Sequence, residues 1–381
     1  WDELEAHARD WFDYSEACMA DALSKLPTGA AVRQSTHDAL PDMPPGGITI
    51  TAKVGIDSAA QMAEVDLRDN PDAQPCGLNL SEACARTAAM LGVFNSIDHT
   101  VPKNAGSMRR IRIHLRENCV AGIPVHPTSC SAATTNIADR VANAVQAAFA
   151  EIADGAGMAE CGASTAPAAG VISGFDPRLG RPFVNQVFLG RTCGAAGPQA
   201  DAWQTICHVG NAGMCYLDSV ELDELRFPLH VKARGFEPDS EGAGRTCGAQ
   251  VGFAMFGPRG CELDVIYNSD GHFNGPKGVR GGHDGTCSHQ HVLGRNGEEK
   301  PAPQFGRVTL QDGEYLCSFS CGGGGYGPPQ ERDVTAVLRD IKALVVSPER
   351  ARQIYGVVLD ETGALDEAAT QKRRQELARE S

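Results

Sequence analysis

Apolar side chains near both ends of the chain recur every three to four residues, which is the spacing of an amphipathic helix. Near the N-terminus this pattern predicts a helix over residues 1–26. The clearest apolar stripe predicts a helix over Asn136–Ile152, with Thr134, Thr135 or Asn136 as its cap. Further helices are expected at 81–90, 333–344, 348–355 and 366–380. Ser347 and Asp366 are suitable caps for the last two.

Runs rich in β-branched and aromatic residues predict strands between these helices. Residues 48–54 and 62–67 are expected to form a hairpin. Other predicted strands are 111–114, 183–188 and 229–231. Because Gly-rich turns separate short runs from 161 to 260, the pattern indicates an α+β fold: mixed, with a sheet-rich centre and flanking helices at both ends.

Three regions follow from this pattern along the chain. Residues 1–160 form a helix-strand region that contains the capped helix 136–152. Residues 161–330 form a sheet-rich, Gly-containing region, and residues 331–381 form a C-terminal helical tail.

The acidic composition of the chain argues against anionic partners such as nucleic acid. The 381 residues include 48 acidic residues and 34 Lys or Arg, which gives a formal net charge of −14. Nucleic acid and anionic membrane surfaces attract clustered cations, so we expect neither as a partner. No apolar run approaches the roughly 20 residues that span a bilayer. The 14 cysteines contain no CxxC pair, so we expect reduced thiols and a cytoplasmic protein.

The segment from His126 to Ser131 places an imidazole, hydroxyls and the Cys130 thiol just before the strongest predicted helix. A helix N-terminus favours anions and thiolates, so His126 and Cys130 are candidate catalytic residues. The alternative is simple capping by Ser and Thr beside a buried cysteine.

Three other segments allow a functional and a structural interpretation. The turn Asp239–Gly248 can form an anion-binding nest, or it can be a turn between two strands. The cluster His283–His291 has two histidines on one strand face, but it lacks the paired spacing of a zinc site, so we expect a surface loop and no metal. The run Cys321–Gly327 suits either a close approach of another backbone or ligand, or a linker.

Taken in order, short motifs along the chain resemble the B-type subunits of the hydantoinase/oxoprolinase enzymes. They are Asn104–Ile111, the helix start TTNIADRV, Asp239–Gly244, Gly275–Gly282, the tail GGGGYGPPQERD, Tyr355–Val358 and Leu365–Asp366. The resemblance extends over nearly the whole chain from about Phe12.

The resemblance implies part of a multi-subunit, ATP-dependent enzyme. An actin-like A-type ATPase subunit would bind ATP and magnesium and make a phosphorylated intermediate on which the B-type subunit acts. The absence of a phosphate-loop motif here agrees with ATP binding elsewhere. The expected reaction is hydrolysis of a cyclic amide of the hydantoin, lactam or oxoproline type. The alternatives are carboxylation of a ketone of the acetone or acetophenone type, and a non-catalytic scaffold.

The chain resembles only the C-terminal part of such subunits. It lacks their Asn-Asp-Pro segment and the His- and Asp-containing motifs associated with a divalent metal, which belong to the N-terminal half. With its start at Trp1, we expect a split or processed product whose N-terminal half is a separate or missing chain. The turn also departs from the family pattern, with Glu241 at the usual third position and Thr246-Cys247-Gly248 at its end.

Six residues remain as candidates for a site, although no catalytic residue transfers directly from the family. Asn104, His126 and Cys130 are candidates for catalysis. Candidates for binding the substrate or intermediate are Arg109, Asp239 and Ser240.

Overall fold

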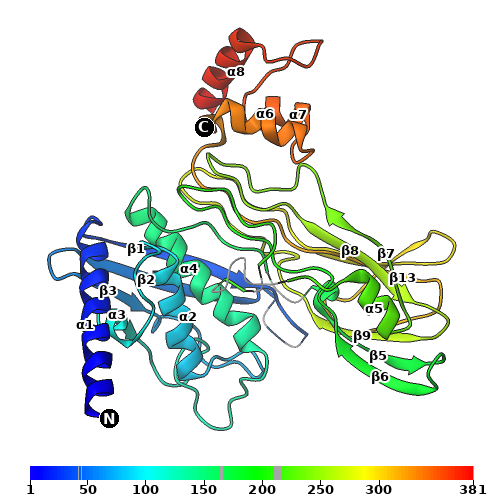
Figure 1. The fold of residues 1–381 in the computed structure, drawn as a ribbon, viewed down its shortest axis with the longest axis horizontal. Coiled ribbons are helices and arrows are strands. Elements are labelled where there is room, and N and C mark those ends of the chain that lie inside the picture. The colour runs from blue at the N-terminus through cyan, green and yellow to red at the C-terminus, as the bar shows by residue number, and fades with distance from the viewer. Residues whose placement is uncertain (42, 44, 164–165, 207, 210–215, 381) are drawn as a thin grey trace. The chain divides into compact units, whose positions relative to one another are not determined.

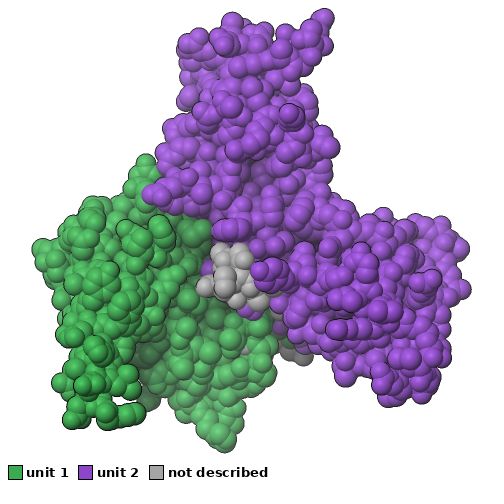
Figure 2. Space-filling view, viewed as in Figure 1, with its two compact units in different colours: residues 1–158 green, residues 159–381 purple. Residues whose placement is uncertain are grey.

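The computed structural model describes residues 1–41, 43, 45–163, 166–206, 208–209 and 216–380. The chain divides into two compact units, residues 1–158 and residues 159–381 (Figures 1 and 2). The predicted α+β class is confirmed, because helices at both ends flank a chain that forms three sheets. The division into three regions stays a prediction.

The first unit contains a four-stranded sheet with the strand order β1-β2-β3-β4. Neighbouring strands are antiparallel except β3 and β4, which are parallel. Its strands are β1 (Gly29–His37), β2 (Ile48–Asp57), β3 (Met62–Asp66) and β4 (Ile111–His114). Its helices are α1 (Asp2–Ser24), α2 (Glu82–Phe94), α3 (Ala105–Met108) and α4 (Ile137–Ile152), with a 3₁₀ turn at Ala133–Thr135.

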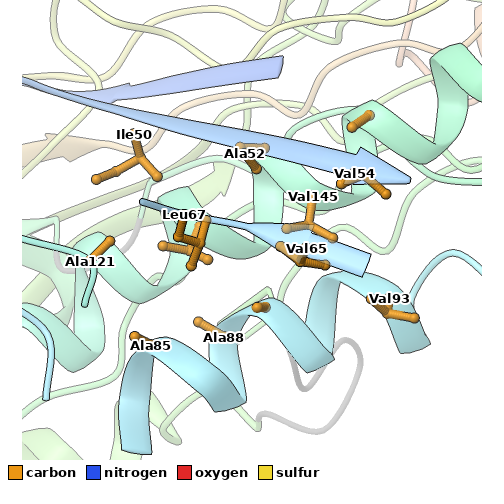
Figure 3. Close-up of a cluster of buried hydrophobic side chains, with 14 of the residues drawn as sticks. Ile50, Ala52, Val54, Val65, Leu67, Ala85, Ala88, Val93, Ala121 and Val145 are labelled. Atoms are coloured by element: carbon orange, nitrogen blue, oxygen red, sulfur yellow. The ribbon is translucent and has the colours of Figure 1, made fainter. Parts of the chain in front are cut away.

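One face of this sheet forms the core of the unit together with α2 and α4. Alternate residues of β2 are buried, as expected for a strand with one covered face. Figure 3 shows Ile50 and Val54 of β2 and Leu67, just after β3, facing Ala88 of α2 across the core. Burying one such aliphatic side chain contributes about 1.5–3 kcal/mol, so this core holds sheet and helices together.

Two features of the first unit go beyond the sequence predictions: the side-chain contacts of the α4 cap and the strand β1. Asn136 is the N-cap of α4, but its side chain makes no cap hydrogen bond. Instead, its Oδ1 accepts from Thr135 Oγ1 at 2.9 Å, and its Nδ2 lies 2.9 Å from Nε2 of His37. Strand β1 was not predicted, because Val32 is its one large aliphatic residue and is 56% exposed.

The second unit contains two further sheets, both antiparallel. The five-stranded sheet has the order β11-β10-β13-β8-β7, and the four-stranded sheet has the order β12-β9-β5-β6. One hydrophobic cluster contains Phe256 and Leu316 of the first sheet and Ile172 and Val265 of the second, so the sheets pack face to face. The strands are β5 (Val171–Asp176), β6 (Arg181–Gln186), β7 (Leu229–Phe236), β8 (Gly252–Pro258), β9 (Leu263–Asn268), β10 (His289–Leu293), β11 (Glu299–Pro301), β12 (Phe305–Leu310) and β13 (Tyr315–Phe319).

The helices of the second unit include α5 (Val220–Arg226) and, at its C-terminal end, α6 (Val334–Lys342), α7 (Pro348–Ile354) and α8 (Glu367–Glu380) (Figure 1). Two 3₁₀ turns lie at Pro167–Ala169 and Pro329–Glu331. The predicted caps are confirmed: Ser347 Oγ accepts from Arg350 N at 3.1 Å, and Asp366 Oδ1 accepts from Ala369 N at 2.9 Å.

Extended segments without strand assignment form what we call the glycine bundle, made of residues 159–163, 193–197, 242–249, 275–285 and 321–327. Backbone hydrogen bonds join the segments, among them Gly242 N to Gly323 O at 3.0 Å and Gly324 N to Glu160 O at 2.9 Å. A Cβ added to Gly323 would lie 1.7 Å from the carbonyl oxygen of Gly194. The run 321–327 therefore serves the close approach of other backbones, as one of its two interpretations predicted, and is not a linker.

No helix within the described ranges is both long and apolar enough to cross a membrane. The described cysteines, from Cys18 to Cys321, are free thiols, and Cys207 and Cys215 lie outside the described residues.

Candidate functional site

A histidine, a serine and a glutamine meet in the second unit where the loop after β9 returns to β10. Nε2 of His272 lies 2.8 Å from Oε1 of Gln290, and Nδ1 of His272 lies 3.1 Å from Oγ of Ser288. Oγ of Ser288 also donates to the carbonyl oxygen of Asp270 at 2.8 Å. We call His272, Ser288 and Gln290 the histidine relay.

Local backbone geometry brings the relay together. The Ser288 amide donates to the Gly271 carbonyl at 2.9 Å, and the Gly271 amide donates to Oδ1 of Asp270 at 2.8 Å. Gly271 has φ +81°, and a Cβ there would lie 2.3 Å from Sγ of Cys321. Glycine is therefore required at this turn, which packs against Cys321 of the glycine bundle.

The carboxamide of Gln290 is fixed in one orientation. Its Nε2 donates to the Pro303 carbonyl at 2.8 Å, a carbonyl that also accepts from the hydroxyl of Tyr267 at 2.7 Å. Burial raises the pKa of Tyr267, which keeps this donor protonated. With Nε2 of Gln290 committed, Oε1 faces His272 and selects the tautomer of His272 that carries a proton on Nε2.

This arrangement allows His272 to gain and lose a proton at Nδ1. When only Nε2 is protonated, Nδ1 is an acceptor for the proton of Ser288 or of a reacting group. When both nitrogens are protonated, Nδ1 donates to Oγ of Ser288, whose own proton goes to the Asp270 carbonyl. In this doubly protonated form, the hydrogen bonds of His272 to Gln290 and Ser288 and that of Ser288 to Asp270 can all form together. A base held by an orienting group is the usual arrangement for general acid–base or nucleophilic catalysis.

His272 is half-buried, and the polar groups around it are sheltered from solvent. Ser288 is 5% exposed, Gln290 is 8% exposed and Asp270 is 4% exposed. Beside Asp270, the hydroxyl of Ser269 is buried and has no hydrogen-bond partner among the described residues. A low-dielectric setting of this kind strengthens the effect of each charge and proton placed in it.

The candidates Asn104 and Arg109 both lie against α1. Oδ1 of Asn104 caps α3 by accepting from Gly106 N at 2.9 Å, and its Nδ2 donates to Ser15 Oγ at 2.8 Å. Nη1 of Arg109 pairs with Glu16 Oε2 at 2.9 Å and also contacts Asp13. These polar groups hold α1 and α3 together.

The candidates His126 and Cys130 lie in the loop that precedes α4. His126 is exposed and Cys130 is half-buried. Burial, and then the neighbouring Cys84, raises the pKa of the Cys130 thiol, which disfavours the thiolate. By contrast, the pKa of the Cys84 thiol, in the first turn of α2, is lowered because hydrogen bonds from the hydroxyls of Ser81 and Thr134 stabilise its thiolate.

Asp239 and Ser240 lie in the connection between β7 and β8, so the turn does join two strands. Asp239 Oδ1 accepts from Ser347 N at 2.6 Å, and Ser240 Oγ accepts from Val251 N at 2.9 Å. Amides of the turn donate to backbone carbonyls of the glycine bundle, for example Arg245 N to Gly327 O at 3.1 Å. The arrangement is therefore a packed turn and not an open anion nest. The substrate-binding role of Asp239 and Ser240 stays a prediction.

The cluster His283–His291 is only partly a surface loop. His289 and His291 lie on β10 and share one face, where both rings stack on Phe319, at centroid distances of 4.3 Å and 6.0 Å. Burial lowers the pKa of His289 and outweighs the nearby carboxylate of Glu237. Across the described parts of the chain, no group of three or more His, Cys, Asp or Glu is arranged to hold a metal ion.

The structure does not bring the six sequence candidates into one constellation within either unit, and the relay was missed. One signal was available in the sequence: His272 and Ser288 flank the motif Gly275–Gly282. A glycine-rich segment of this length can fold back on itself, which places its two flanks side by side. The sequence alone does not say which polar residues on the flanks meet.

Comparisons with known proteins add the evolutionary context. The model of the family described as hydantoinase B/oxoprolinase matches residues 1–329. The chain is 28% identical to caprolactamase subunit beta of Pseudomonas jessenii, over 98% of this chain and 64% of that protein.

Two solved structures have a similar fold. The crystal structure of the ATP-dependent caprolactamase from Pseudomonas jessenii aligns with a TM-score of 0.81 at 24% identity, over 98% of this chain and 64% of that one. A nucleotide-free structure of acetone carboxylase aligns with a TM-score of 0.76 at 14% identity, over 94% of this chain and 53% of that one. The chain thus spans less than two thirds of the length of these relatives.

Proposed function

The chain belongs to the hydantoinase B/oxoprolinase family, and we propose that it forms part of an ATP-dependent enzyme complex that opens a cyclic amide. The observation that carries this proposal is the 28% identity to caprolactamase subunit beta along 98% of the chain. Apart from this similarity, the hydrogen bonds of the histidine relay suit it to proton transfer.

In the proposed reaction, the work is divided between subunits. An A-type, actin-like ATPase partner binds ATP and magnesium and transfers the γ-phosphoryl group to the amide oxygen of the ring. Phosphorylation makes the amide carbon electrophilic and turns the oxygen into a leaving group. One water adds to the carbon and the ring C–N bond breaks, which frees the amine and leaves an acyl phosphate at the former amide carbon. A second water then hydrolyses the acyl phosphate to a carboxylate and inorganic phosphate.

The proposed role of this chain is to accept and transfer the proton of the attacking water. Nδ1 of His272 accepts that proton, while Gln290 holds the ring through Nε2. The same nitrogen can then return the proton to the departing ring nitrogen. A positioned acid–base group of this kind accelerates a reaction by about 10²–10⁴-fold.

The remaining partners and cofactors belong to the same proposal. The N-terminal half of the B-type subunit supplies the rest of the active site, and it is where a divalent metal would be bound. In support, the described residues of this chain contain no group of three or more His, Cys, Asp or Glu arranged to hold a metal ion.

A substrate panel tests the reaction class. The chain is purified with whatever subunit accompanies it, and phosphate release from ATP is measured with a lactam, with a hydantoin, and with a ketone plus bicarbonate. We expect phosphate release with a cyclic amide, in step with the ring-opened amino acid. Turnover with the ketone and bicarbonate alone would replace the proposal by ketone carboxylation. Full activity of the other subunits without this chain would make it a scaffold.

A further inference from the structure

A separate pocket of about 310 Å³ opens at one end of the five-stranded sheet in the second unit. Its walls come from α5, β7, the end of β8 and the turn before β13. The lining side chains that carry charge or a polar ring are Glu224, His230, Arg259, Asp312 and Tyr315. A pocket of this size accommodates a small molecule.

The two carboxylates of this pocket are held in place by the backbone. Oε1 of Glu224 accepts from Val231 N at 2.8 Å, and Oδ1 of Asp312 accepts from Gly260 N at 2.7 Å. Each carboxylate commits one oxygen to a main-chain amide, and the other oxygen has no partner among the described residues. Both negative charges are therefore oriented before any ligand arrives, which reduces the entropic cost of binding.

The positively charged side chain that lines the pocket forms no ion pair within the described structure. Arg259 lines the same pocket, but its guanidinium forms no hydrogen bond or ion pair with any described residue, including Glu224 and Asp312. Opposite charges that share a pocket without pairing are available to a ligand that carries both signs. Guanidinium suits a carboxylate, since it can form two parallel hydrogen bonds to it.

A neutral donor accompanies the guanidinium. Nδ1 of His230 and the hydroxyl of Tyr315 are 2.8 Å apart. Whichever of the two donates in this bond, one proton of the pair remains for another acceptor: Nε2–H of His230 or O–H of Tyr315. Lys232 lies over the ring of Tyr315, with Nζ 4.9 Å from the centroid, and adds to the positive side.

We propose that this pocket binds a small zwitterion, an amino carboxylate whose ammonium group lies at Glu224 and Asp312 and whose carboxylate lies at Arg259 with the His230–Tyr315 pair. The ligand class follows from the charges of the pocket. It is also the class of product that hydrolysis of a cyclic amide releases, so in this respect the inference rests on the proposed function and adds a product-binding site to it. Binding itself requires no turnover.

Calorimetry of the purified protein, together with any subunit that accompanies it, tests the proposal in the absence of ATP. The probe is 6-aminohexanoate, with hexanoate and hexylamine as compounds that each lack one charge. We expect saturable binding of the amino acid and at least about tenfold weaker binding of the singly charged compounds. Equal affinities for all three compounds, or no saturable binding at about 10 mM probe, would overturn the proposal.

Three variants locate the binding. Arg259→Met removes the guanidinium at an exposed position, and we expect about a tenfold or larger loss of affinity. Glu224→Gln and Asp312→Asn keep an oxygen acceptor for the backbone amides while they remove the charge, so the fold is retained and each should weaken binding. The control is Arg352→Met on α7, an exposed arginine away from the pocket lining, which should bind as the wild type does.

Unchanged affinity in Arg259→Met would place the ligand elsewhere and refute the proposed site. Because the assay contains neither ATP nor a cyclic amide, its failure leaves the proposed reaction standing. Conversely, failure of the substrate panel leaves binding to this pocket measurable.

Discussion

Asp223 on α5 is a carboxyl group that the fold destabilises in its charged form. It is buried, and its Oδ2 has no hydrogen-bond partner among the described residues. Burial, and then the charge of Asp218, raises the pKa of Asp223 to about 6. An unperturbed aspartate titrates near pH 4. The folded state therefore binds this proton more tightly than the unfolded chain does.

The sign of the pH dependence follows from linkage. The contribution of Asp223 to stability is fully present below about pH 4 and is lost as the pH rises to about 6. Asp223→Asn, which is neutral throughout, should melt at a higher temperature than the wild type at pH 7.5, a pH above both values, and close to it at pH 4. Thermal unfolding over this pH range checks the prediction, with exposed Glu361→Gln as the control. Identical pH profiles for the Asp223 variant and the wild type would contradict it.

At the scale of residues, the sequence predicted polar types but not their partners. Asn104 was a candidate for catalysis, and Arg109 and Asp239 were candidates for substrate binding, yet each side chain makes a hydrogen bond or ion pair with a residue far away in sequence. Their partners Ser15, Glu16 and Ser347 lie 89, 93 and 108 residues away. Contacts at such separations depend on the folded topology, so a pattern read along the chain does not reveal them.

At the scale of elements, the close backbone contacts of the glycine bundle predict a large effect of one substitution on the free energy of unfolding. Gly323→Ala would place a methyl group 1.7 Å from the Gly194 carbonyl oxygen, which forces two backbones apart. Overpacking of this kind costs about 1–3 kcal/mol and occasionally more. We therefore expect a clear loss in free energy of unfolding, measured by urea titration of the full chain.

Gly252→Ala is the matched control in the same unit. An added Cβ there would meet Ser320 Oγ at 3.5 Å, an ordinary contact. This substitution should leave stability unchanged or raise it slightly, because alanine restricts the unfolded chain. If both variants unfold alike, the bundle is looser than the structure indicates.

The first half of α1 carries an apolar stripe without cover in the described structure. None of residues 1–14 is buried, and the rings of Trp11 and Tyr14 stack 5.6 Å apart while 54% and 56% exposed. An isolated helix of this length is marginal in water, so it gains from packing on a partner. The segment has five acidic residues and one arginine, which favours a partner groove with a basic rim. Within the complex proposed above, we propose this surface as a contact with a partner chain.

Replacing both Trp11 and Tyr14 by Ser should weaken association with that partner while the unit stays folded. Buried aromatic residues at interfaces commonly contribute about 2 kcal/mol or more. Association measured by sedimentation or by co-purification checks this. Leu225→Ser on α5, another exposed apolar position, is the control. Unchanged association in the α1 variant would remove the helix from the interface.

Helices and strands were predicted correctly where the hydrophobic pattern of the segment itself indicated the element. The amphipathic stripes of α1, α4 and α6 and the alternation of β2 and β3 were sufficient. Strand β1 was missed because it is defined by its register with β2, from Gly29 opposite Ile56 to His37 opposite Ile48. The sequence does not decide between the two interpretations of residues 321–327, because glycine has no side chain whose pattern indicates a neighbouring backbone.

At the scale of the whole molecule, the α+β class and the family followed from the sequence, and the histidine relay did not. The relay depends on a loop closure between residues 16 positions apart and on a glutamine of β10 that Pro303 orients. In the proposed function, this relay moves a proton during the ATP-dependent opening of a cyclic amide.

The most direct test is the steady-state kinetics of His272→Gln in the purified complex, with a cyclic amide that the wild type turns over. Glutamine retains hydrogen bonding but cannot carry a proton between groups. We expect kcat to fall by about 10²–10⁴-fold with little change in KM and in the melting temperature, while His289→Gln keeps wild-type kinetics. A kcat for His272→Gln equal to that of the wild type would show that His272 transfers no proton in the rate-limiting step.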